Sequence, residues 1–150
     1  PDVILVGEMR DEETIMMALS AAETGHLVLG TLHTTSAPKT VDRIIDVFPA
    51  ADKELVRSML SSSIQAIIAQ TLIKKSDGGG RVAALEVLLG TPGVRNLIRE
   101  NKIAQIRTVL QTSAEEGMIT MDQDIINLYQ GGMINKETAQ FHMLNPELLS

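Results

Sequence analysis

The chain has 150 residues, of which 44% are hydrophobic and 2% aromatic, and its formal net charge is −6 at pH 7. This length suits one domain, and the apolar content is too high for a disordered chain. The acidic balance disfavours a nucleic-acid partner, which needs clustered Lys and Arg. The chain has no Cys, which excludes disulfides and thiolate metal sites and fits a reducing cytoplasm. No apolar run approaches the roughly 18 residues of a membrane span, so any membrane association must go through a partner protein.

The first 35 residues predict a strand, a helix and a second strand. Val3–Val6 is an apolar run that is followed by Glu8, and Leu27–Leu32 is a second one that is followed by His33. Asp11 can cap the helix between them, which has about 13 residues. This order predicts a right-handed crossover with parallel strands, so both polar side chains are expected at one edge of a sheet.

Two further helices are expected next. Ser36 and Pro38 signal the start of the first one, and Pro49 interrupts it. The second is expected to run from about 52 to 72 because its apolar residues recur at helical spacing. These residues are Leu55, Val56, Met59, Leu60, Ile64, Ile67, Ile68 and Leu72. We interpret this stripe as core rather than as a groove for a partner.

The rest of the chain changes character twice. Residues 74–80 end in three glycines and predict a turn, and residues 82–89 predict a strand that completes the sheet or pairs as a hairpin. After Gly90 the chain reads as short helices, expected at about 92–100, 102–112, 120–130 and 135–142. The sequence therefore predicts an α/β fold, with residues 1–90 as its core and residues 91–150 as a helical C-terminal subdomain.

Glu8 and His33 are the candidate catalytic residues. Hydrolysis of ATP needs a carboxylate near the γ-phosphate to orient water, and the end of a buried strand holds such a group rigidly. A His at the matching end of the second strand can donate to a γ-phosphate oxygen. The alternatives are an ordinary strand-end acid at Glu8 and a satisfied structural histidine at His33.

Three more residues are candidates for nucleotide binding. His26 begins the strand that ends near His33, and at about 3.3 Å per residue the two imidazoles are expected roughly 20 Å apart. His26 should therefore face the opposite edge or another subunit, or it is simply a polar strand entry. Thr31 and Thr34 could supply hydroxyl groups to a phosphate, although capping of the following helix is the alternative for Thr34. No set of metal ligands is identified.

Several segments together resemble one family. VILVGEMRD, residues 3–11, resembles the atypical Walker B segment of the secretion-type hexameric ATPases, and GHLVLGTLHTTSA, residues 25–37, resembles their histidine box. DRIIDVFPA, residues 42–50, and VRSMLSSSIQAIIAQTLIKK, residues 56–75, continue the match. GVRNLIRE, residues 93–100, is similar to the AIRNLIRE motif of the pilus retraction ATPases, the motors of twitching motility.

The resemblance implies a partial RecA-like P-loop ATPase core with a parallel sheet, followed by a helical C-terminal layer. It implies a homo-hexamer that binds ATP and Mg²⁺, powers retraction of type IV pili, and docks on the inner-membrane platform protein at the cytoplasmic base of the pilus. By resemblance, Glu8 aligns with the catalytic glutamate, and His26 and His33 align with the two histidine-box positions. The segment associated with retraction is Val94, Arg95, Asn96, Leu97, Ile98, Arg99 and Glu100.

Two departures from the common patterns are visible. Gly93 replaces the alanine that opens the retraction motif. Gly7 stands where common P-loop ATPases keep the Asp that holds Mg²⁺, so the metal is expected to be held mainly by phosphates and by the absent phosphate loop. The related assembly and type II secretion ATPases carry a four-cysteine zinc motif, which is missing at residues 74–80 and thus favours retraction over extension.

No G-x-x-x-x-G-K-[ST] phosphate loop occurs in the chain, which opens on Pro1 directly at a strand. We interpret the chain as the later part of a larger ATPase whose first strands are absent. The isolated residues are then expected to hydrolyse no ATP at a useful rate, and to dimerise, swap elements or aggregate through an uncovered sheet. The alternatives are a non-catalytic ring-assembly or interaction module, and an extension or secretion ATPase of the same superfamily.

Overall fold

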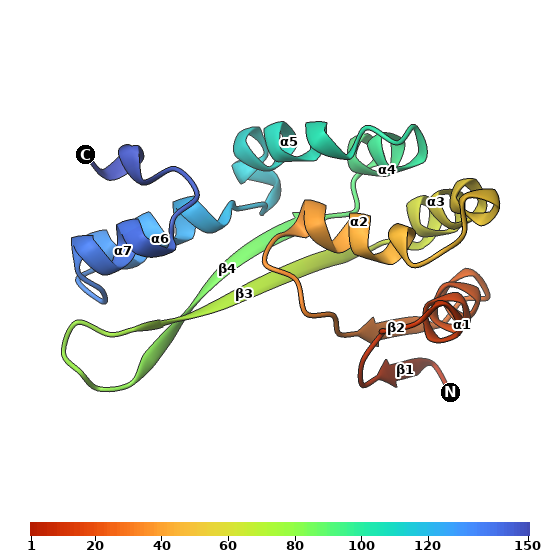
Figure 1. Cartoon of the computed structure of the whole chain (residues 1–150), viewed down its shortest axis with the longest axis horizontal. Helices are drawn as coiled ribbons and strands as arrows, with labels where there is room; N and C mark the ends of the chain where they lie inside the picture. Colours follow the sequence, from red (N-terminus) through yellow and green to blue (C-terminus); the bar gives the residue numbers. More distant parts are fainter. The chain divides into compact units, whose positions relative to one another are not determined.

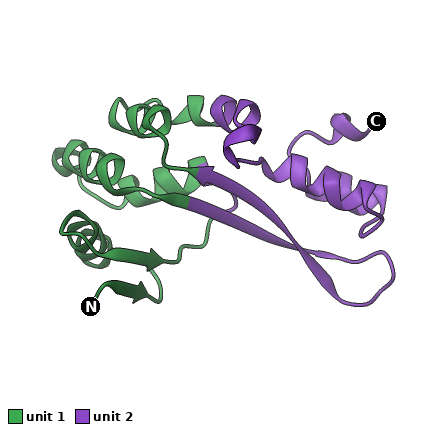
Figure 2. Cartoon of the chain, turned by 180° about the vertical axis from the view of Figure 1, so that it is seen from behind, with its two compact units in different colours: residues 1–34, 38–66, 89–106 green, residues 35–37, 67–88, 107–150 purple.

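The computed structural model describes all 150 residues, which pack as two compact units (Figure 2). Unit 1 comprises Pro1–Thr34, Pro38–Ala66 and Leu89–Ile106, and unit 2 comprises Thr35–Ala37, Ile67–Leu88 and Arg107–Ser150. Each unit combines residues from both sides of residue 90, the predicted domain boundary. In chain order the elements (Figure 1) are β1 (Val3–Val6), α1 (Glu12–Glu23), β2 (Leu27–Gly30), α2 (Ala37–Asp46), α3 (Lys53–Ser63), β3 (Ala66–Lys74), β4 (Arg81–Leu89), α4 (Pro92–Arg99), α5 (Ile106–Thr112), α6 (Met121–Gln130) and α7 (Lys136–His142).

The predicted crossover is confirmed in unit 1. β1 and β2 pair in parallel, with Val3 opposite Leu27, and α1 connects them. The carboxylate of Asp11 caps α1 by accepting the N–H of Thr14 at 2.8 Å. The helix is followed by Gly25 at φ +96°, a left-handed conformation that glycine adopts without a steric penalty. β2 ends two residues earlier than predicted.

The predicted helix over residues 52–72 is wrong in its second half, because α3 ends at Ser63 and β3 begins at Ala66. The hydroxyls of Ser61 and Ser62 bond back to the carbonyl of Ser58, a local competition that weakens a helix near its end. The following residues are rich in β-branched Ile, which favours a strand.

The apolar stripe misleads because residues four apart share a face in a helix and in a strand alike. In β3 the pair Ala69 and Ile73 is buried, whereas Ile68 and Leu72, which belong to the predicted helical stripe, are 65% and 50% exposed. Leu55, another member of that stripe, is also exposed on α3. The stripe is therefore core only in part.

β3 and β4 form a second, separate two-stranded sheet (Figure 1). Only residues 75–80 connect them, and so short a connection requires antiparallel strands. The turn closes with a hydrogen bond from the N–H of Lys75 to the carbonyl of Gly80 at 3.0 Å. Of the two alternatives for residues 82–89, the hairpin is therefore confirmed.

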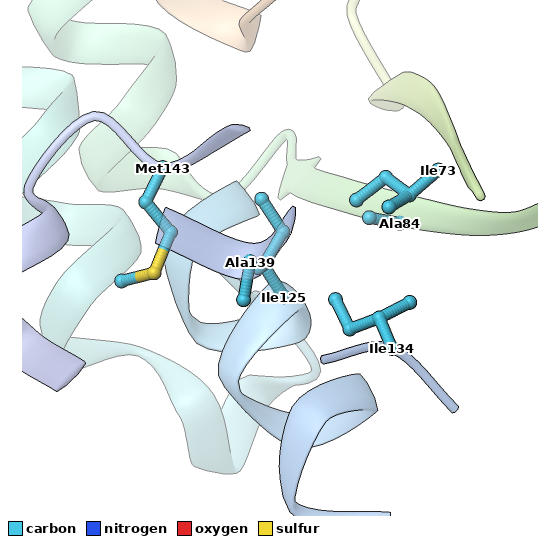
Figure 3. Close-up of a cluster of buried hydrophobic side chains, with 6 residues drawn as sticks. All are labelled: Ile73, Ala84, Ile125, Ile134, Ala139 and Met143. Carbon is cyan, nitrogen blue, oxygen red and sulfur yellow. The ribbon is translucent and has the colours of Figure 1, made fainter. Parts of the chain in front are cut away.

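Each unit has its own apolar core. In unit 1, α1, α3 and α4 pack together, with Ile15, Val56, Val94 and Ile98 almost fully buried. In unit 2, the hairpin packs with α6 and α7 around a cluster shown in Figure 3, which consists of Ile73, Ala84, Ile125, Ile134, Ala139 and Met143. The predicted short helices after residue 90 are confirmed. None of the helices combines the length and apolar content that a bilayer crossing requires.

Candidate functional site

Glu8 and His33 lie side by side at one edge of the parallel sheet in unit 1. The Oε1 atom of Glu8 is 3.0 Å from Nε2 of His33. Glu8 follows β1 by two residues and His33 follows β2 by three, so the parallel pairing delivers both to the same edge. The structure thus brings together the two residues that the sequence analysis paired. Their catalytic role stays a prediction.

Arg10 is a third member of this group that the sequence analysis did not single out. Its Nη2 atom is 2.7 Å from Oε2 of Glu8, so the carboxylate has one cation or imidazole on each oxygen. The hydrogen bond from Arg10 lowers the pKa of Glu8, and the charges of Arg10 and His33 lower it further. The carboxylate is therefore held in its charged form. The sequence does contain a signal for this pair, because Glu8 and Arg10 are two positions apart in the loop after β1 and carry opposite charges.

The loops after β1 and β2 are joined by two bonds that support the pair. The N–H of Met9 donates to the carbonyl of Thr31 at 2.9 Å, and the hydroxyl of Thr31 donates to the carbonyl of Gly7. Both loops therefore hold each other in register beyond the last pair of the sheet. The hydroxyl of Thr31 is thus used in a hydrogen bond within the chain, although the residue is exposed.

An open cavity of about 310 Å³ contains the pair, and its lining residues are Glu8, Met9, Arg10, Leu32, His33 and Arg43. Arg43 comes from α2 and was not predicted as a site residue. Two guanidinium groups, an imidazole and a single carboxylate make a site suited to a phosphate group, because Arg presents several N–H donors to phosphate oxygens. One carboxylate alone does not make a Mg²⁺ site, and no cluster of three or more His, Asp or Glu could hold a metal ion.

The other predicted nucleotide-binding residues lie outside this cavity. Nδ1 of His26 is 3.1 Å from the carbonyl oxygen of Ala21 and 3.3 Å from Oγ1 of Thr24, at the opposite end of β2 from His33. The hydroxyl of Thr34 is 2.6 Å from that of Thr40. As expected, the two histidines do not meet within one chain, and the role of His26 and of both threonines in binding stays a prediction.

The segment from Val94 to Glu100 lies on α4 and divides into a buried and an exposed side. Thr91 caps the helix, since its hydroxyl accepts the N–H of Val94 at 3.4 Å. Val94 and Ile98 are fully buried in the core of unit 1. The exposed side is formed by Asn96, Arg99 and Glu100.

Arg95 is half-buried, between the buried and the exposed side of α4. All the hydrogen bonds of its guanidinium are made to residues of unit 1. It donates to three backbone carbonyls, those of Gly90 at 2.8 Å, Ser62 at 2.6 Å and Ile64 at 2.6 Å. Arg95 therefore acts as a structural clamp between α4 and the end of α3. Nothing in the motif's sequence separates this arginine from the exposed Arg99.

Comparison with known proteins supports the resemblance seen in the sequence. A family model described as type II/IV secretion system protein matches residues 1–138. The chain is 63% identical over 150 residues to a twitching motility protein of Neisseria gonorrhoeae, covering 100% of this chain and 40% of that protein. It is 60% identical over 147 residues to the type IV pilus retractation ATPase PilT of Pseudomonas aeruginosa, covering 98% and 42% respectively.

A solved structure agrees with the predicted α/β fold. The crystal structure of the pilus retraction motor PilT with bound ADP matches with a TM-score of 0.87 and 49% identity, over 99% of this chain and 41% of that one. The chain thus spans about two fifths of the length of these relatives. With a family model that matches most of its residues, the chain belongs to the type II/IV secretion system protein family.

Proposed function

We propose that the chain is the part of a hexameric ATP-driven motor that holds the catalytic carboxylate and a histidine for the γ-phosphate, and that this motor powers pilus retraction and twitching motility. The observation that carries the proposal is the contact of Glu8 with His33 at the edge of two parallel strands, inside a cavity with two arginines. The relatives named for twitching motility and pilus retraction support the biological role.

In the proposed reaction, a water molecule beside Glu8 attacks the γ-phosphorus of ATP, and the bond from that phosphorus to the bridging oxygen of ADP breaks. Because Arg10 lowers the pKa of Glu8, the carboxylate is a weak base. Its main task is therefore to orient the water, and it accepts the proton only late. When ATP binds, Nε2 of His33 turns from Oε1 of Glu8 to a γ-phosphate oxygen, which leaves Oε1 free for the water molecule. The guanidinium of Arg43 balances the developing charge.

Binding of the nucleotide needs more than these residues. Phosphate loops provide backbone N–H groups and a lysine that neutralise the phosphates, and no such loop motif occurs in the 150 residues. Mg²⁺ would neutralise phosphate charge and would be held mainly by the phosphates themselves. The 150 residues by themselves are therefore proposed to turn over no ATP at a useful rate. Phosphate release by the isolated chain at the rate of the native protein would contradict this.

The proposed assembly rests on the family resemblance of the sequence rather than on the geometry of the chain. The proposed partners are sister subunits in a ring of six and an inner-membrane platform protein at the cytoplasmic base of the pilus. Pull-down of the native protein with the cytoplasmic loops of such a platform protein tests this. Retention of binding after charge reversal at Arg99 and Glu100 would place the contact elsewhere.

The experiment measures ATP hydrolysis and twitching with the protein as its gene encodes it. Glu8→Gln is expected to lower kcat by about 10²- to 10⁴-fold, because a positioned carboxylate contributes this much. His33→Ala is expected to lower kcat as well. Glu13→Gln, at an exposed acid on α1, is the matched control and should behave as the wild type. Wild-type turnover in both Glu8→Gln and His33→Ala would favour a non-catalytic ring-assembly module instead.

A further inference from the structure

A second carboxylate, that of Glu86 on β4, is buried and joins two helix starts within unit 2. The side chain is 2% exposed. Its Oε1 atom accepts the N–H of Ala37 at 2.8 Å, and its Oε2 atom accepts the N–H of Met121 at 3.0 Å. Ala37 is the first residue of α2 and Met121 is the first residue of α6. One carboxylate therefore binds the starting amides of two helices that are far apart in sequence.

This placement is favourable for both partners. The first N–H groups of a helix have no acceptor within the helix, and the helix dipole puts partial positive charge at this end. A buried carboxylate is costly unless its oxygens are hydrogen-bonded. Glu86 meets both needs at once, because each oxygen lies at the N-terminal end of a different ten-residue helix.

The segment held by Glu86 leads directly to the candidate site. Thr35–Ala37 packs in unit 2, whereas His33 and Thr34, immediately before it, pack in unit 1. His33 is therefore four residues from the anchored amide of Ala37. The contact of Thr34 with Thr40 further restrains the path of the chain between the imidazole and α2. Only three residues thus separate His33 from the residue whose amide is anchored.

We propose that Glu86 is a positioning residue for His33, and that it links the γ-phosphate histidine to the start of α6 in the C-terminal helical layer. The inference rests on the proposed function, since it concerns the same site. The proposed link runs along the chain from His33 to Ala37, and from the N–H of Ala37 through the carboxylate to the N–H of Met121. Glu86 itself does not touch the nucleotide.

The replacement Glu86→Gln separates this role from simple packing. Gln has the same size, but its NH₂ group faces a backbone N–H where an acceptor is needed. One of the two helix starts thus loses its partner. Glu86→Asp is a second variant, because a side chain shorter by one methylene cannot reach both amides.

Asp122 offers a matched control within unit 2. This carboxylate is 9% exposed and accepts two backbone N–H groups, those of Leu144 at 2.8 Å and Asn145 at 2.9 Å. Neither of these residues is a chain neighbour of the histidine segment. Asp122 directly follows Met121, so Asp122→Asn disturbs a comparable buried acceptor at the start of α6 but leaves the bond from the Ala37 N–H to Glu86, and with it the histidine segment, in place.

The experiment uses the native protein with ATP and Mg²⁺, and measures kcat, the melting temperature, and the affinities for ADP and for a non-hydrolysable ATP analogue. Glu86→Gln and Glu86→Asp are expected to lower kcat between about 10- and 100-fold. They should weaken the ATP analogue more than ADP, because His33 contacts only the γ-phosphate. In the background of His33→Ala, Glu86→Gln should lower kcat no further. Asp122→Asn should lower the melting temperature alone.

Three outcomes overturn the inference. The first is equal loss of affinity for both nucleotides in Glu86→Gln, and the second is an effect that adds fully to that of His33→Ala. The third is that both Glu86 variants behave like Asp122→Asn and lower the melting temperature alone. In all three cases the proposed function stays intact if His33→Ala still lowers kcat. Apart from these outcomes of the Glu86 variants, unchanged kcat in His33→Ala removes the proposed role of His33 in the reaction, and the inference then fails for that reason; the rest of the proposed function falls only if Glu8→Gln is also unchanged.

Discussion

The guanidinium of Arg95 donates from Nη2 to the carbonyl oxygen of Ile64 at 2.6 Å, directly after the last turn of α3. Its Nη1 and Nε atoms bond to Ser62 and Gly90 in the same way. The last carbonyls of a helix lack partners within the helix, so this arginine completes the end of α3. Part of the segment that resembles a retraction motif thus stabilises the fold of unit 1.

Replacement of Arg95 by Lys should destabilise the protein by about 2 kcal/mol, because a single ammonium cannot reach three carbonyls that a planar guanidinium spans. Urea unfolding measures the change. Arg99→Lys on the exposed side of α4 is the control and should stay within about 0.5 kcal/mol of the wild type. Equal stability of both variants would show that the clamp contributes nothing.

Gly90→Ala should be strongly destabilising. A Cβ atom at Gly90 would lie 2.2 Å from the carbonyl oxygen of Ile64, which is backbone and has little freedom to move. The N–H of Gly90 also bonds to the carbonyl of Gln65 at 2.8 Å, so the two segments cannot separate without further loss. We expect a cost of about 3 kcal/mol or more by thermal unfolding. A melting temperature equal to that of the wild type contradicts the close approach.

Gly93→Ala should have the opposite sign. Nothing lies within 4 Å of a Cβ atom at Gly93, which is the second residue of α4. Alanine restricts the unfolded chain and favours the helix, so the variant should gain about 0.5–1 kcal/mol. This change also restores the alanine of the motif that residues 93–100 resemble. A destabilised variant in the same thermal assay would mean that the first turn of α4 needs the freedom of glycine.

The pKa of Glu8 should depend more strongly on Arg10 than on His33. In an NMR titration of the carboxyl carbon, Glu8 should show a pKa below its ordinary value, and Arg10→Gln should raise it more than His33→Ala does, because the bond from Arg10 is the larger cause. A folded-state pKa that is lowered gives stabilisation that is present above the unfolded pKa and lost as pH falls through the folded pKa. A raised pKa in the wild type would contradict the pairing.

The parallel sheet of unit 1 should promote self-association of the 150-residue chain. Val3, Leu5, Leu27 and Leu29 are each about half exposed or more, and the register of the strands places them on one face. Burial of apolar surface of this kind favours contact between copies. Light scattering should show dimers or larger species, and Leu5→Gln with Leu29→Gln should reduce them. A clean monomer at high concentration would contradict this expectation.

The sequence predicted the structure correctly where neighbouring residues alone determine it. Glycine and capping residues marked the helix ends, and the parallel order of β1 and β2 predicted that Glu8 and His33 would meet. The helix prediction failed at residues 64–72, where the apolar spacing fits a helix and a strand alike and where the chain pairs with β4 as a strand. The roles of Arg10, Arg43 and Glu86 depend on contacts between distant segments, which no local pattern contains.

The short length of β2 has a consequence for how the chain can change over time. Its backbone is already extended, so it fixes the separation between His26 and His33. The strand cannot lengthen or shorten to compensate for an inserted or deleted residue. One added or deleted residue would displace one imidazole by about 3.3 Å and turn it to the other face of the sheet. A change in the length of β2 would therefore disturb the site even where every remaining residue of the strand stayed the same.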